Sequence, residues 1–138
     1  MTEASLALQE AIRAVLIANL PLAAMVAPEA IFDRSQRPEI FPCIIIGDGQ
    51  TVLEDTAYDR RVIRVFSDLH VWTNEGDLSS VKIIAGAVQE ALRGVVLTLQ
   101  DHSVVDFKIA STRFGADPGG QHAHAVIGAE ALLQESAQ

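Results

Sequence analysis

One twelve-residue segment, residues 61–72, constrains the fold more than any other part of the chain. Its side chains alternate in character, which is the period of an extended strand and not of a helix. One face carries five small or aliphatic residues, namely Ile63, Val65, Ser67, Leu69 and Val71. Because four of these five side chains are aliphatic and gain by leaving water, the pattern predicts a long strand with this face turned to the core.

The opposite face of this strand has a mixed composition. It carries Val62, Arg64, Phe66, Asp68, His70 and Trp72. Aromatic residues and Arg are enriched where proteins meet, so we predict a subunit interface that includes Arg64, Phe66, His70 and Trp72. The alternative is a solvated sheet face with two isolated aromatic side chains, since single exposed apolar residues are common on protein surfaces.

Two segments have the spacing of amphipathic helices. Residues 4–19 place Leu8, Ile12 and Leu16 on one face, and Pro21 ends this helix because a proline disfavours helical geometry at the residue before it. A short turn at residues 22–26 can follow. The second helix is expected to begin at an N-cap supplied by Asn74 or Asp77 and to end near Gly94.

Three more strands are expected, at residues 41–46, 104–114 and 122–133. Gly47, Asp48 and Gly49 are predicted to turn the first of these into a polar loop, residues 50–59. The sequence Asp-Pro-Gly-Gly at residues 117–120 predicts a turn between the last two. One face of the last strand carries mostly small side chains, which permit close approach of a neighbouring element: Ala123, Ala125, Ile127, Ala129 and Ala131.

The resulting order is helix, strand, strand, helix, strand, strand. Because strands and helices do not alternate singly, this order favours an α+β fold with an antiparallel or mixed four-stranded sheet and two amphipathic helices packed on one face. A chain of 138 residues without an internal repeat or linker fits a single domain, residues 1–138.

Composition excludes two classes of partner as defaults. The chain has 10 Lys and Arg against 18 Asp and Glu, a net charge of −8, and its basic residues are scattered, so tight non-specific binding to nucleic acid is not expected. The apolar stretch at residues 14–27 is interrupted by Asn19 and Pro21 and lacks a basic leader, so neither a membrane span nor a signal peptide is predicted. The single cysteine, Cys43, lies in an apolar run and is expected to be buried.

No pattern of residues supports catalysis. The chain has neither a Gly-x-Ser-x-Gly nucleophile motif nor a phosphate-binding loop, so no enzyme activity, catalytic residue, cofactor or metal site is predicted. One alternative is a metal-binding module or metal-dependent enzyme, because His122 and His124 share a strand face close to Asp117. A second alternative is a ferredoxin-like ligand-sensing module, although no convergent set of polar residues lines a pocket for it.

Several short motifs, taken in order, resemble one known family. They are the first helix with its small-residue ending, Phe-Pro-x-Ile-x-Ile-Gly at residues 41–47, His-Val-Trp-Thr at residues 70–73, the helix at residues 79–92, and the last hairpin with its aspartate turn. In this order and spacing they are similar to the tail terminator, or tail-completion, proteins that join head and tail in long-tailed bacteriophages and gene transfer agents. The final strand departs from that family's pattern, with Ala129, Glu130 and Ala131 where basic and aromatic residues are usual.

The resemblance implies a structural role in a virion. Proteins of this family form rings, usually of six copies, that cap the tail tube, stop its polymerisation and offer a docking surface to the head-tail connector or stopper. DNA passes through the ring without specific binding, and the net negative charge of this chain is compatible with such a passage. The resemblance therefore implies a homo-oligomer with the tail tube protein and the connector as partners, at the end of the tail of a phage or gene transfer agent particle, assembled in the bacterial cytoplasm.

Overall fold

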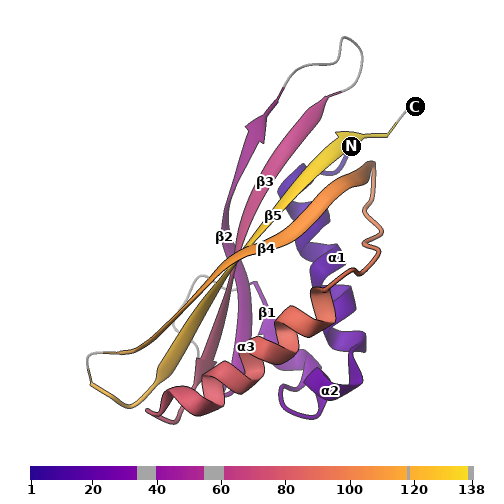
Figure 1. Cartoon of the computed structure of the whole chain (residues 1–138). Helices are drawn as coiled ribbons and strands as arrows, with labels where there is room; N and C mark the ends of the chain where they lie inside the picture. Colours follow the sequence, from indigo (N-terminus) through magenta and orange to yellow (C-terminus); the bar gives the residue numbers. More distant parts are fainter. Residues whose placement is uncertain (34–39, 55–60, 118, 137–138) are drawn as a thin grey trace.

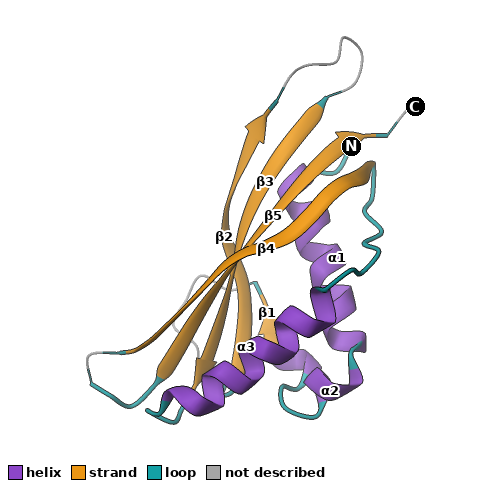
Figure 2. Ribbon diagram, in the orientation of Figure 1, coloured by secondary structure: helices purple, strands orange, loops and turns teal. Residues whose placement is uncertain are grey.

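The computed structural model describes residues 1–33, 40–54, 61–117 and 119–136. A twisted sheet of long strands forms one layer, and helices cover one of its two faces (Figures 1 and 2). The elements in chain order are α1 (Ala4–Ala18), α2 (Leu20–Ala23), a 3₁₀ turn η1 (Pro28–Ala30), β1 (Ile31–Phe32), β2 (Cys43–Leu53), β3 (Val62–Thr73), α3 (Leu78–Leu92), β4 (His102–Ala116) and β5 (Ala123–Glu135).

The predicted α+β class with a mixed sheet is confirmed, but the layout of four strands and two helices is wrong, because the short elements β1 and α2 were missed. The sheet has five strands in the order β1-β2-β3-β5-β4, and it is mixed because β1 pairs in parallel with β2 while the other neighbours are antiparallel. The short helix α2 directly follows α1, and the side chain of Asn19 caps it by accepting a hydrogen bond from Leu22 N. Elements of two to four residues have no measurable periodicity, so the sequence pattern does not reveal them.

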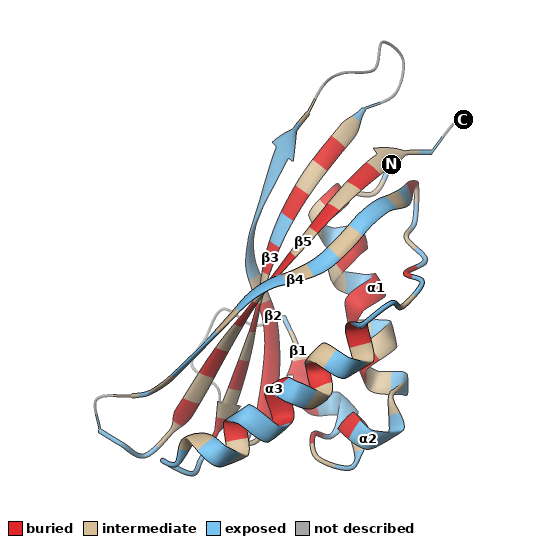
Figure 3. Ribbon diagram, in the orientation of Figure 1, coloured by how far each residue is buried: buried red, intermediate tan, exposed pale blue. Residues whose placement is uncertain are grey.

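The core lies between the helices and the covered face of the sheet. The predicted alternation is confirmed on β3, where Val65, Leu69 and Val71 are fully buried, and on β5, where alternate positions are buried along the whole strand. On α1, Leu8, Ile12 and Leu16 are buried, as their helical spacing predicted. Figure 3 shows buried positions alternating with less buried ones along β3 and β5.

The expected turn at residues 47–49 is wrong. β2 continues past it to Leu53, and the pairing register with β3 shifts by one residue between Ile46 and Gly49, which is a β-bulge. A Cβ atom on Gly49 would lie 2.6 Å from the carbonyl oxygen of Phe66, so only glycine fits beside the partner strand here. The first four residues of the expected loop at residues 50–59 are therefore strand, up to Leu53. Residues 55–59 of it, like residues 34–39 of the loop before β2, lie outside the described residues.

Candidate interaction surface on the open face of the sheet

The face of the sheet opposite the helices, which we call the open face, brings together side chains from four strands. All four residues of the predicted interface lie on it, because they occupy alternate positions of β3. Phe66 is the most accessible of them, with 37% of its surface exposed, and Arg64, His70 and Trp72 are half-buried. Their cross-strand neighbours are Cys43, Ile45, Gln50 and Val52 on β2 and His124, Val126, Glu130 and Leu132 on β5.

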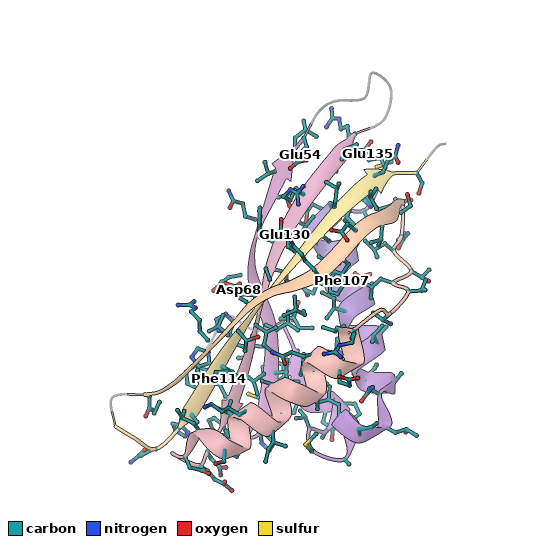
Figure 4. The ribbon with its side chains drawn as sticks, in the orientation of Figure 1. Glu54, Asp68, Phe107, Phe114, Glu130 and Glu135 are labelled. Carbon is teal, nitrogen blue, oxygen red and sulfur yellow. The ribbon has the colours of Figure 1, made fainter. Side chains whose placement is uncertain are left out.

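A row of alternating charges crosses the open face near one end of the sheet. Arg64 Nε lies 2.5 Å from Glu54 Oε1 and its Nη1 lies 2.7 Å from Glu130 Oε1, while Lys108 Nζ lies 3.9 Å from Glu130 Oε2. Hydrogen bonding from Arg64 lowers the pKa of the Glu54 carboxyl below its usual value. The guanidinium therefore holds the end of β2 and the middle of β5 to β3, so Arg64 already has partners within its own subunit. Figure 4 labels Glu54 and Glu130, which lie on either side of β3.

A row of stacked rings occupies the other half of the open face. The ring of His124 stacks on Trp72 at a centroid distance of 3.9 Å and on His70 at 5.1 Å, and His70 Nδ1 lies 3.0 Å from His124 Nε2. Only one of these two nitrogens can carry the shared proton. Burial, followed by the nearby charges of His70 and Arg113, lowers the pKa of His124 to about 4, so this ring is neutral near pH 7. Trp72 is thus partly covered by its own subunit.

His124 is the partner that sequence reasoning missed on this face. It was considered only as a metal ligand, because it lies two residues from His122. No local pattern relates it to Trp72, which is 52 positions earlier in the chain (124 − 72). The two residues are neighbours because β5 lies beside β3 in the sheet, and the sequence did not indicate that strand order.

The three candidate metal ligands each have another role. Asp117 Oδ1 accepts hydrogen bonds from the backbone N–H groups of Gln121 and His122 at 3.1 and 3.4 Å, and thereby stabilises the turn between β4 and β5. The His122 ring stacks on Phe41 at 4.6 Å, and His124 pairs with His70. Within the described part of the chain, no group of three or more His, Cys, Asp or Glu residues is placed to hold a metal ion.

The ferredoxin-like alternative is wrong. That fold requires the order β-α-β-β-α-β, whereas the long elements here follow the order α1-β2-β3-α3-β4-β5.

Comparison with known proteins decides the family. Residues 10–134 match the family model described as Tail completion protein gp17. The chain belongs to this family. Its structure is similar to a chain of the virion of a native gene transfer agent particle, with a TM-score of 0.83, 19% identity, and 96% of this chain and 99% of the other covered. It is also similar to the gp17 protein of bacteriophage SPP1, with a TM-score of 0.64, 25% identity, and coverage of 93% and 89%. No curated protein sequence matches significantly.

Family membership confirms the resemblance found in the sequence and gives the general role. The tail completion protein is a structural component of a phage-type tail and therefore of the virion. No helix in the described ranges is long and apolar enough to cross a lipid bilayer.

Proposed function

We propose that this tail completion protein is a ring-forming terminator. Six copies would form a ring that caps the tail tube, stops its growth and joins it to the head-tail connector or stopper protein, with DNA passing through the hole without specific binding. The single observation that supports this proposal best is the match of residues 10–134 to a tail completion family. The fold shared with a chain of an assembled gene transfer agent particle over 96% of this chain adds to it.

The charge of the chain fits a conduit for DNA. The net charge is −8, and four of the seven basic side chains within the described residues have partners in the same subunit. Arg64, Arg93 and Lys108 lie beside glutamates, and Arg13 donates hydrogen bonds to the backbone oxygens of Ile31 and Pro28. A surface that does not concentrate cations binds phosphates weakly, so DNA could move past it without being held.

The open face of the sheet is the proposed contact surface between subunits. It exposes the Phe66 ring in the middle of a face that none of the described helices covers, while Arg64, His70 and Trp72 flank this ring on the same strand. An aromatic side chain in the centre of such a surface is typical of residues that contribute most to association. Because Arg64 and Trp72 already have partners within the subunit, Phe66 is the member of the set whose loss should affect association most specifically.

Two measurements test the ring. Multi-angle light scattering on the purified protein should give six times the monomer mass of 14.8 kDa, either alone or after addition of tail tubes. Negative-stain images of tube ends should show a cap where the protein was added. A protein that stays monomeric at high concentration and leaves tube ends bare is not a terminator ring.

Variants test the proposed contact surface. Phe66→Ser should reduce the ring fraction at least tenfold at a fixed concentration, while the thermal midpoint of the monomer changes little. Ile83→Ser is the matched control, because Ile83 is an exposed aliphatic residue on α3, on the opposite side of the sheet. Equal effects of the two substitutions would exclude a specific role for the open face.

A further inference from the structure

The two edges of the sheet are not equally protected against pairing with another strand. A free strand edge presents unpaired N–H and C=O groups, and proteins usually guard it with charges, proline or bulges. On β2, the part of β1 that the structure describes covers the edge at Ile44 and Ile45. Beyond the bulge, residues 49–53 have the sequence Gly-Gln-Thr-Val-Leu, with no charged residue, proline or further bulge.

This stretch of β2 is also exposed on both sides of the sheet. All five residues are exposed, although the first four residues of the same strand are buried. Val52 and Leu53 lie on opposite faces with 37% and 49% of their surfaces accessible. Figure 3 shows the upper part of β2 as a continuous exposed ribbon beyond the helices. A regular, uncharged edge that exposes two apolar side chains is a site for strand addition.

The strand at the opposite edge of the sheet, β4, also has a regular stretch with little charge. β4 contains two register shifts against β5, between Val104 and Asp106 and between Ile109 and Ser111, which disrupt its first half. Its last six residues, Ser111 to Ala116, pair regularly with β5 and carry a single charge, on Arg113. Phe114 is 40% exposed in this stretch.

The strand directions allow the two stretches of neighbouring copies to pair. The four long strands are antiparallel to their neighbours in the order β2-β3-β5-β4, so β2 and β4 run in opposite directions. In a head-to-tail arrangement of copies, β4 of one copy therefore lies antiparallel to β2 of the next, and the alternation continues across the boundary. We propose that residues 111–116 of each copy pair with residues 49–54 of the next copy, an inference that rests on the proposed ring.

The side chains agree with this pairing. If Thr112 lies opposite Leu53, then Arg113 lies opposite Val52 on the open face and Phe114 lies opposite Thr51 on the helix side. In that register Phe114 is diagonal to Leu53, which gives an apolar contact. Arg113 is diagonal to Glu54, which gives a contact of opposite charges. This charge complementarity favours a second copy of the same chain as the partner. Arg113 and Phe66 both lie on the open face, so in this pairing the contact adjoins the proposed surface there.

The offset between the two edges suits a closed ring of tilted strands. Within one copy, Leu53 on β2 pairs with Ile63 on β3. Thr112 on β4 pairs with Ile127 on β5, which pairs in turn with Leu69 on β3. The two edge residues are therefore offset by six residues along β3 (69 − 63). At about 3.4 Å per residue this is an offset of roughly 20 Å, against a width of about 19 Å for four strands about 4.8 Å apart. The strands would then tilt by about 45°, within the range of closed barrels.

Cross-linking between introduced cysteines tests the pairing. The variant Val52→Cys/Arg113→Cys, treated with a short bismaleimide, should give a ladder of covalent multimers. A mixture of the two single variants should give dimers only, and each single variant alone should give none. Cys43 does not interfere because it is buried. The control variant Val52→Cys/Val105→Cys has its second cysteine at an exposed site in the disrupted half of β4 and should remain uncross-linked.

Each other outcome has a defined meaning. Rings that form normally but do not cross-link overturn the strand pairing and leave the terminator proposal intact. Cross-linked dimers of the Val52→Cys single variant show a symmetric β2–β2 contact and also overturn it. A protein that is monomeric by light scattering and does not cross-link overturns both proposals. Circular dichroism of each variant confirms that the monomer fold is retained, and Leu53→Asp should reduce ring formation at least tenfold where Ile83→Asp does not.

Discussion

The imidazole of His124 stacks on the indole of Trp72, with ring centroids 3.9 Å apart and ring planes 10° from parallel. Stacked aromatic pairs contribute about 0.5–1.5 kcal/mol beyond the burial of their surface. We expect Trp72→Ala to lower the free energy of unfolding by about 1–3 kcal/mol and Trp72→Phe by less, since the ring stack is then partly kept. Urea unfolding followed by circular dichroism measures this, and an unchanged midpoint for Trp72→Ala would show that the stack contributes nothing to the monomer.

The low pKa of His124 predicts a loss of stability in mild acid. The folded protein holds this ring neutral down to about pH 4, whereas the unfolded chain takes up a proton near pH 6.5. The unfolded state therefore binds more protons between these values, and the free energy of unfolding falls as the pH drops from 6.5 to 4. After allowance for partial exposure, the loss assigned to His124 is about 1–2 kcal/mol.

The variant His124→Phe isolates this effect, because it keeps a ring beside Trp72 but cannot be protonated. Its stability should change less than that of the wild type over the same pH range, and the difference between the two curves belongs to His124. Parallel curves for the two proteins would contradict the assignment. An NMR titration of the His124 ring gives the pKa directly.

Gly49 should be intolerant of any side chain. Its Cβ position lies 2.6 Å from the carbonyl oxygen of Phe66, and backbone on the paired strand cannot move aside easily. Gly49→Ala is expected to cost about 1–3 kcal/mol of stability. Gly86, in the middle of α3, has nothing within 4 Å of its Cβ position, so Gly86→Ala should stabilise the protein by about 0.5–1 kcal/mol. Thermal melts of the pair should shift in opposite directions.

Arg64 should stabilise the sheet in a salt-dependent manner. It makes ion pairs with Glu54 and Glu130 on the two neighbouring strands. Arg64→Met should lower the urea midpoint, and the decrease should be smaller at 1 M salt because screening weakens the wild-type pairs. Arg93→Met is the matched control, since Arg93 is largely exposed and approaches only Glu90 on its own helix, at 3.8 Å. If both variants lose the same stability, the cross-strand position of Arg64 has no special role.

Cys43 should be unreactive in the folded protein. It has no exposed surface, and burial raises the pKa of its thiol to about 11, so very little thiolate forms at pH 8. A colorimetric disulfide reagent should therefore label no thiol in the native protein and one per chain in urea. Rapid labelling without denaturant would show that this end of β2 opens readily.

Local and periodic features of this protein could be read from the order of its amino acids. The alternation in residues 61–72 fixed a strand with two unlike faces, and the spacing of Leu8, Ile12 and Leu16 fixed the buried side of α1. These features follow from the repeat of side-chain directions along one element, which is present in the chain before any packing occurs.

Tertiary structure decided which of these elements are neighbours. The placement of β5 beside β3 brings His124 to Trp72 and Glu130 to Arg64, and the pairing of β2 with β3 turns an expected loop at Gly49 into a bulged strand. No local pattern encodes such contacts, because strand order and register are selected by how the whole sheet buries its face against the helices. The β3 residues of the open face were therefore predictable from the sequence of that strand. Their partners on the neighbouring strands and the free edges of the sheet were not.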